Sequence, residues 1–142
     1  MEVALRVTVL DPPAAVTFRM QRGRSELVPP AKEDAHSISF DLALRVASRD
    51  GDAAPRFLGA FAQGPPASRF LYVSSGKRAG QFESEWDRRA KVPLAGITWS
   101  LIEQAQAAGD CVIEARIAGT GRDGGPACAT VPLIGAWRVV AI

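Results

Sequence analysis

The sequence has a single histidine, His36, and two cysteines, Cys111 and Cys128, among its 142 residues. One imidazole cannot form the histidine cluster that binds zinc or iron, and the cysteines have neither CxxC nor zinc-finger spacing. A Ser-His-Asp or Cys-His arrangement would have only His36 as its base, and His36 lies in the polar stretch KEDAHS. We therefore expect no metal and no cofactor, and we expect both cysteines to be small buried thiols.

A strong charge of one sign is also absent. The formal net charge is +2, and only three of the 17 basic residues are lysines. This excess falls well short of the basic surface of a dedicated nucleic-acid binder. The opening run MEVALRVTVLDPP has no basic segment before it and is too short for a signal peptide or a membrane span. These absences predict a cytoplasmic protein that binds neither nucleic acid nor a membrane.

What the sequence does have is alternation of apolar and polar residues, without internal repeats. In ISFDLALRV, the residues Ile38, Phe40 and Leu42 share one face, while Ser39 and Asp41 point the other way. Such alternation is typical of half-buried strands, and turn residues separate the runs. The expected strands are 3–10, 16–20, 38–46, 56–62, 69–74, 88–94, 111–117, 129–133 and 137–141. The sequence predicts one mainly β domain over residues 1–142, an antiparallel β-sandwich or flattened barrel of about eight or nine strands.

One segment has helical spacing instead. In GITWSLIEQAQAAGD, apolar residues recur every three to four positions, and Ser100 and Glu103 have the spacing of a capping box. Gly109 follows as a stop signal. We expect one short α-helix near residues 98–108, covering an open end or edge of the sheets.

The longest stretch without clear periodicity is QRGRSELVPPAKEDAH, residues 21–36. Loops of that length tend to be functional or mobile. We therefore expect this segment to face a ligand.

The stretch GTGRDGGPACATVPL, residues 119–133, carries four glycines close together. Gly119, Gly121 and Gly124 have the spacing of a dinucleotide fingerprint, but a strand-like run follows Pro126 where that motif needs a helix. Two interpretations stand. The glycines form a tight connection, or their backbone forms an anion-binding nest to which the adjoining Arg122 and Asp123 contribute.

A second basic segment, SGKRAGQFESEWDRRAKVPL, contains Lys77, Arg78, Arg89 and Lys91. On a strand, Arg89 and Lys91 share a face. Three acidic residues between the two basic ends favour a solvated strand with ion pairs. The functional alternative is a positively charged site for an acidic ligand or partner.

Three consecutive segments, GPPASRFLYVSSGKRAGQ, WDRRAKVPLAGITWSLIEQA and IEARIAGTGRDGGPACATVPL, resemble a family of small single-domain bacterial proteins classed as a domain of unknown function. The resemblance runs from Phe61 to the C-terminus, and the runs 86–94 and 119–133 are its specific parts. It implies a soluble bacterial protein. It implies no catalytic residues, because that family has no assigned activity.

These observations favour a non-catalytic module that binds a small anionic ligand or a protein partner. The candidate ligand-binding residues are Arg122, Asp123, Arg89, Lys91, Lys77 and Arg78. The alternative is a cofactor-independent isomerase, cyclase or hydrolase with a pocket inside the β structure, in which Tyr72, His36 and Asp123 are the acid–base candidates. A third class, a protein that dimerises through strand edges, leaves the oligomeric state open.

Overall fold

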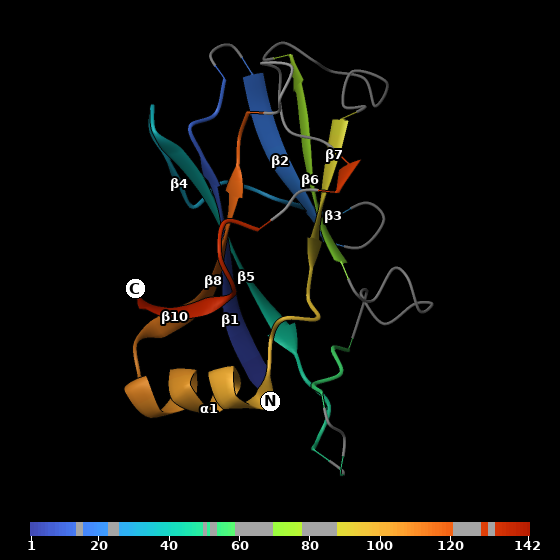
Figure 1. Cartoon of the computed structure of the whole chain (residues 1–142), viewed down its shortest axis with the longest axis vertical. Helices are drawn as coiled ribbons and strands as arrows, with labels where there is room; N and C mark the ends of the chain where they lie inside the picture. Colours follow the sequence, from blue (N-terminus) through green and yellow to red (C-terminus); the bar gives the residue numbers. More distant parts are fainter. Residues whose placement is uncertain are drawn as a thin grey trace.

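The computed structural model describes residues 1–13, 16–22, 26–49, 51, 54–58, 70–77, 88–120, 129–130 and 133–142 (Figure 1). Of these, residues 21–22, 26–27, 76–77, 88–90 and 129–130 are described by their backbone alone. The elements in this part of the chain are β1 (Glu2–Leu10), β2 (Val16–Arg22), β3 (Glu26–Val28), β4 (Lys32–Glu33), β5 (Ser37–Arg45), β6 (Phe70–Lys77), β7 (Arg88–Pro93), α1 (Trp99–Ala108), β8 (Cys111–Ala118), β9 (Ala129–Thr130) and β10 (Arg138–Ala141).

The strands form two sheets that face each other across one core. Sheet A has the strand order β10-β8-β1-β5-β4, and sheet B has the order β3-β2-β6-β7-β9. A single hydrophobic cluster takes side chains from both sheets, and Figure 1 shows them as two layers. The predicted mainly β fold with one helix is confirmed; in the described residues it is a sandwich of two open sheets.

The sheets are not wholly antiparallel. β1 pairs with β8 in parallel, and β9 pairs with β7 in parallel, whereas the other strand pairs are antiparallel. Apolar–polar alternation has the same period in both kinds of sheet, so it carries no information on strand direction. The prediction of antiparallel pairing therefore missed these two ladders.

The core is built from the alternation seen in the sequence. On β1, every second residue from Val3 to Val9 is at most 5% exposed. Across the antiparallel pair, Leu5 lies beside Leu42 and Val7 beside Phe40. Burying each such side chain stabilises the fold by roughly 1.5–3 kcal/mol. The inward faces of β1 and β5 thus fix which residues of these strands point outward.

Seven predicted strands coincide with β1, β2, β5, β6, β7, β8 and β10. The strand expected over 56–62 is wrong in its described part, because Phe57 forms only an isolated bridge with Val46, and residues 59–62 lie outside the described residues. Of the strand expected over 129–133, only β9 and a bridge between Leu133 and Ile117 are present in the described residues. A strand of two residues that pairs with a single neighbouring strand is too short for apolar–polar alternation to predict it.

The segment 21–36 is not the long structureless loop that its sequence indicated. It carries the end of β2, then β3 at one edge of sheet B and β4 at one edge of sheet A. After β4, the Oδ1 atom of Asp34 accepts backbone hydrogen bonds from His36 at 2.7 Å and Ser37 at 2.9 Å. Both residues of β4 are polar and exposed, so that strand has no buried face to enforce alternation, which explains why its sequence shows none.

The helix begins two residues earlier than its capping-box spacing indicated. Thr98 is the N-cap, and its hydroxyl accepts a hydrogen bond from the Leu101 amide at 3.2 Å. Ser100 lies inside the first turn and accepts a side-chain hydrogen bond from Gln104, so the predicted Ser100–Glu103 capping box is wrong. The stop at Gly109 is confirmed, with φ at 87°. As expected, α1 covers one end of the sandwich, where it buries Trp99 and Ile102 (Figure 1).

Two close contacts tie the ends of the strands together. The Trp137 indole N–H donates to the carbonyl oxygen of Pro93 at 2.8 Å, which joins the start of β10 in sheet A to the end of β7 in sheet B. At the other end of the sandwich, the Gly119 amide donates to the Leu10 carbonyl at 2.7 Å. A Cβ atom at position 119 would lie 2.7 Å from that oxygen and 2.8 Å from the Cα atom of Pro12. Position 119 therefore requires glycine.

We expect Gly119→Ala to lower the free energy of unfolding by about 2–3 kcal/mol, because the added methyl group meets backbone atoms that cannot rotate away. Chemical denaturation measures this loss. The control is Gly135→Ala, where φ is 79° and the space around the Cβ position is open, so backbone strain alone costs about 1 kcal/mol. An unchanged denaturation midpoint for Gly119→Ala would contradict the packing argument.

The Asp34 turn gives a pH dependence. The backbone amides of His36 and Ser37 lower the pKa of Asp34 below its ordinary value of 3.8. The ionised carboxylate therefore stabilises the fold above that value, and this contribution is lost as the pH falls below it, through the folded-state pKa. We expect Asp34→Asn to be less stable than the parent near neutral pH and to lose less stability between about pH 5 and about pH 2. Denaturation at both pH values tests this.

The control for Asp34→Asn is Asp110→Asn, since Asp110 is exposed and its side chain makes no hydrogen bond within the described residues. Equal acid sensitivity of the parent and Asp34→Asn would show that this turn does not contribute to the pH dependence.

Candidate functional site

The outer face of sheet A, the face turned away from the core, carries polar side chains at successive positions of three neighbouring strands. β1 places Arg6 and Thr8 there because the residues on either side of each point into the core. The register then sets Asp41 of β5 beside Arg6 and Ser39 of β5 beside Thr8. This face is therefore organised by strand pairing and by no single stretch of sequence.

The first interaction on this face is a two-point ion pair. Arg6 Nε donates to Asp41 Oδ1 at 2.7 Å, and Arg6 Nη2 donates to Asp41 Oδ2 at 3.1 Å. Hydrogen bonding of Arg6 to the Asp41 carboxylate, followed by the charges of Asp41 and Glu114, raises the pKa of the Arg6 guanidinium against the opposing effect of burial. Arg6 and Asp41 thus neutralise each other.

Glu114 of β8 is the second anchor. Its side chain is only 12% exposed. Its Oε1 atom lies 3.4 Å from Arg138 Nη2 and 3.9 Å from Arg116 Nε. Its Oε2 atom accepts a hydrogen bond from the Thr8 hydroxyl at 3.1 Å. One carboxylate therefore contacts two arginines and accepts a hydrogen bond from one hydroxyl.

The hydroxyl groups of Thr8 and Ser39 form a short chain that ends at this carboxylate. Their oxygens are 3.1 Å apart, and the residues are 6% and 8% exposed. Because the one hydroxyl hydrogen of Thr8 points to Glu114, Ser39 is the donor to Thr8. Both hydroxyl hydrogens are thus used within the protein.

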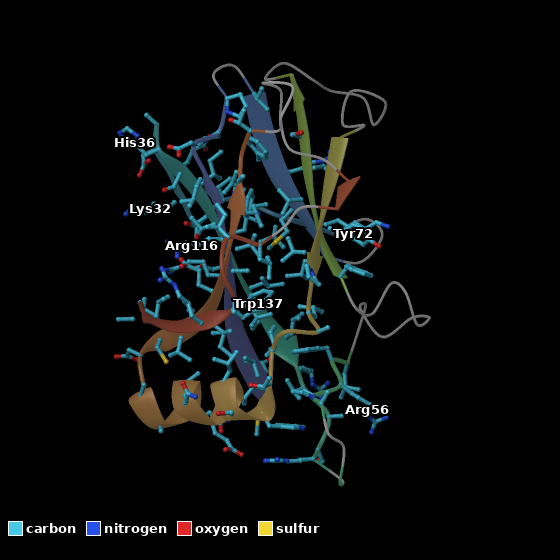
Figure 2. All side chains as sticks on the ribbon, in the orientation of Figure 1. Lys32, His36, Arg56, Tyr72, Arg116 and Trp137 are labelled. Carbon is cyan, nitrogen blue, oxygen red and sulfur yellow. The ribbon has the colours of Figure 1, made fainter. Side chains whose placement is uncertain are left out.

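The hydroxyl pair is flanked by two cations. Arg116 lies beside Thr8, and Lys32 lies beside Ser39, so that Arg116, Thr8, Ser39 and Lys32 form one line across β8, β1, β5 and β4. We call these four residues the sheet A row. Figure 2 shows Lys32 and Arg116 on the same side of the molecule. Lys32 is exposed and makes no ion pair within the described residues, and Arg116 has only the 3.9 Å contact with Glu114.

The basic strand predicted from the sequence lies on sheet B. Lys91 of β7 is exposed, and its ammonium group lies 5.8 Å from the centre of the Phe70 ring. The backbone of Arg89 pairs with that of Ser74, and the backbone of Lys77 pairs with that of Val16 at the end of β6. The side chains of Lys77 and Arg89 are outside what the structure describes, so their role in binding stays a prediction.

The glycine-rich segment is described only at its two ends. Gly119 contacts the Leu10 carbonyl, and the Thr120 hydroxyl donates to the Asp11 carbonyl at 3.1 Å. At the other end, Thr130 pairs with Lys91 in sheet B. The entry of the segment is thus a structural connection. Three predicted site residues, Arg78, Arg122 and Asp123, lie outside the described residues and stay predictions.

Two acid–base candidates of the enzyme alternative are well separated. His36 is exposed just beyond β4 of sheet A, and Tyr72 is half-buried on β6 of sheet B. Figure 2 shows these side chains on opposite sides of the molecule. They do not form a pair. Cys111 is a free thiol that is half-buried rather than buried, and its Sγ atom donates to the Ala105 carbonyl at 3.0 Å; Cys128 lies outside the described residues.

Sequence reasoning missed the sheet A row because its members come from four distant segments. The alternation in β5 placed Ser39 and Asp41 on the solvent side, which was the available signal. The segment 21–36, expected to face a ligand, does contain Lys32. The parallel pairing that sets Arg116 beside Thr8 has no local signal in the sequence.

In the comparison with protein families, residues 3–140 match DUF5990, described as a family of unknown function. The chain belongs to the DUF5990 family. Comparison with curated proteins and with solved structures gave no match.

The described residues of this DUF5990 protein contain no helix long and apolar enough to cross a membrane. In the same part of the chain, no three His, Cys, Asp or Glu side chains are grouped as they would be around a metal ion.

The hydroxyl chain of the DUF5990 protein can be tested through stability. We expect Thr8→Val to lower the free energy of unfolding by about 1–2 kcal/mol, because valine keeps the shape but leaves the Ser39 hydroxyl and one oxygen of Glu114 without their partner. Denaturant titration measures the loss. The control is Thr17→Val on β2, where the threonine is half-buried and makes no side-chain hydrogen bond within the described residues. Equal effects of the two changes would contradict the role of the chain.

Proposed function

We propose that this protein is a non-catalytic binding module whose sheet A row holds an anionic group of a small ligand. The observation that carries the proposal is that Lys32 makes no ion pair within the described residues, while Arg116 has only a 3.9 Å contact with Glu114. Carboxylate and phosphate oxygens are the usual partners of such cations. The guanidinium of Arg116 adds a planar set of donors that suits either group.

The charge balance of the face supports this proposal. Arg6 and Asp41 form a closed pair at 2.7 Å. Glu114 is nearer to Arg138 than to Arg116, at 3.4 Å against 3.9 Å. Arg116 and Lys32 then remain as the excess positive charge of the row. An anion bound there neutralises charge that the protein itself leaves unbalanced.

The role of the hydroxyl groups favours binding over catalysis. A nucleophilic hydroxyl needs a base that takes its proton. Thr8 and Ser39 are only 6% and 8% exposed, and the Glu114 carboxylate that ends their chain already contacts Arg138 and Arg116. We also propose that the protein is bacterial and cytoplasmic. The free thiol of Cys111 supports the cytoplasmic location, because thiols stay reduced in that compartment.

The test is an NMR titration of the ¹⁵N-labelled protein with sodium phosphate at constant ionic strength. We expect saturable shifts of the Lys32, Ser39 and Arg116 amides. Arg116→Gln and Lys32→Gln should each weaken phosphate binding roughly fivefold to tenfold at its own end of the row, because each removes the charge-assisted contact there. Thermal unfolding of both variants checks that the fold is kept.

The matched control is Arg45→Gln. Arg45 is exposed on the same face of β5, and it lies six positions along the strand from Ser39, about 20 Å away. It should leave phosphate binding unchanged. If Arg45→Gln weakens binding as much as Arg116→Gln, the effect is that of net charge and the proposed site is wrong. Shifts that gather around Lys91 on sheet B would instead move the site to the basic strand.

A further inference from the structure

The two cations of the sheet A row are separated across the sheet. Arg116 is on β8 and Lys32 is on β4, with β1 and β5 between them. Three strand spacings of about 4.8 Å place their Cα atoms on the order of 14 Å apart. The row is therefore wider than a single carboxylate or phosphate group.

Arg116 is held at its own end of this span. Its Nε atom faces the Glu114 Oε1 atom at 3.9 Å. Glu114 is in turn fixed by Thr8 at 3.1 Å and by Arg138 at 3.4 Å. This contact places the guanidinium near Glu114 on β8, at the far end of the row from Lys32.

The two hydroxyl groups in the middle of the row have no free hydrogen to donate to an anion. The Thr8 hydrogen is donated to Glu114, and the Ser39 hydrogen is donated to Thr8. Neither hydroxyl has a hydrogen left for a bound oxyanion, and both residues are more than nine-tenths buried. The donors available to a ligand are thus the side chains of Arg116 and Lys32 at the two ends, with the uncharged Thr8 and Ser39 between them.

We propose that the ligand of the sheet A row is a linear dianion with an acidic group at each end, one at Arg116 and the other at Lys32. This inference rests on the proposed function and names its ligand class. With both side chains upright on the sheet, the charged groups are about as far apart as the Cα atoms, on the order of 14 Å. A charge-assisted hydrogen bond of about 2.8 Å at each end then leaves on the order of 8 Å between the acidic groups. Two linked anionic groups bind more tightly than one, because the second contact forms within the complex.

The test compares dicarboxylates of increasing length, namely succinate, adipate and suberate, with the monocarboxylates butyrate, hexanoate and octanoate. Binding is followed by NMR at constant ionic strength. Suberate should bind roughly tenfold more tightly than octanoate, and succinate should show much less advantage over butyrate because it cannot reach both cations.

Variants at the two ends identify the contacts. Lys32→Gln should reduce the affinity for suberate to that for octanoate, whereas Arg45→Gln should leave both unchanged. Arg116→Gln should do the same as Lys32→Gln for suberate. Suberate and octanoate have the same chain length, so these comparisons separate the contribution of the second charge to the affinity from that of apolar contact.

The outcomes separate the two proposals. If suberate binds no more tightly than octanoate while phosphate still binds at the row, the dianion inference is overturned and the proposed function stands. The same conclusion follows if succinate and suberate bind equally. If no acid and no phosphate perturbs the row, both proposals are overturned.

Discussion

The register of β1 between β5 and β8 is the constraint on which the rest of the described structure depends. β1 contributes apolar side chains to the core on one face and Arg6 and Thr8 to the polar face on the other. A slip of one residue would exchange these two faces. Since the inward residues are almost fully buried, such a slip would place Arg6 and Thr8 in the core. The packing of the core thus fixes the positions of the polar network.

The same register explains how the two sides of sheet A serve different purposes. Inside, Leu5 and Val7 hold the two sheets together through the common core. Outside, Thr8 lies where three strands bring Ser39, Glu114 and Arg116 within reach. Rigid strands limit the motion of these side chains more than loops would. A binding face that rests on paired strands is therefore preorganised, and less ordering entropy is lost when a ligand binds.

Much of the fold was predictable because strand alternation is a local property. The runs that became β1, β5 and β8 could be identified from their own residues, and so could the helix and its stop at Gly109. The partners of each strand were not predictable in this way. Nothing near Leu5 indicates that it lies beside Ile113. The edge strand β4 lacked a signal because both of its side chains are exposed.

The candidate site was less predictable than the fold for a geometric reason. Reading along the chain favours basic residues that are close in sequence, such as Arg89 and Lys91. A site on a sheet runs across the strands, so its neighbours are distant in sequence: Thr8 and Glu114 are 106 residues apart. Glycine and arginine in the loops suggested anion binding as a hypothesis, but only the register brings Lys32 and Arg116 to one face.

The parallel pair of β1 and β8 also has a consequence during translation. The ribosome makes β1 first and its neighbour β8 only after more than two thirds of the chain. Until then, β1 in the nascent chain has β5 as a partner on one side and an unpaired edge on the other. Contacts over such sequence separations form slowly. Until β8 is made, the growing polypeptide therefore exposes a valine-rich strand edge of the kind that pairs with other chains.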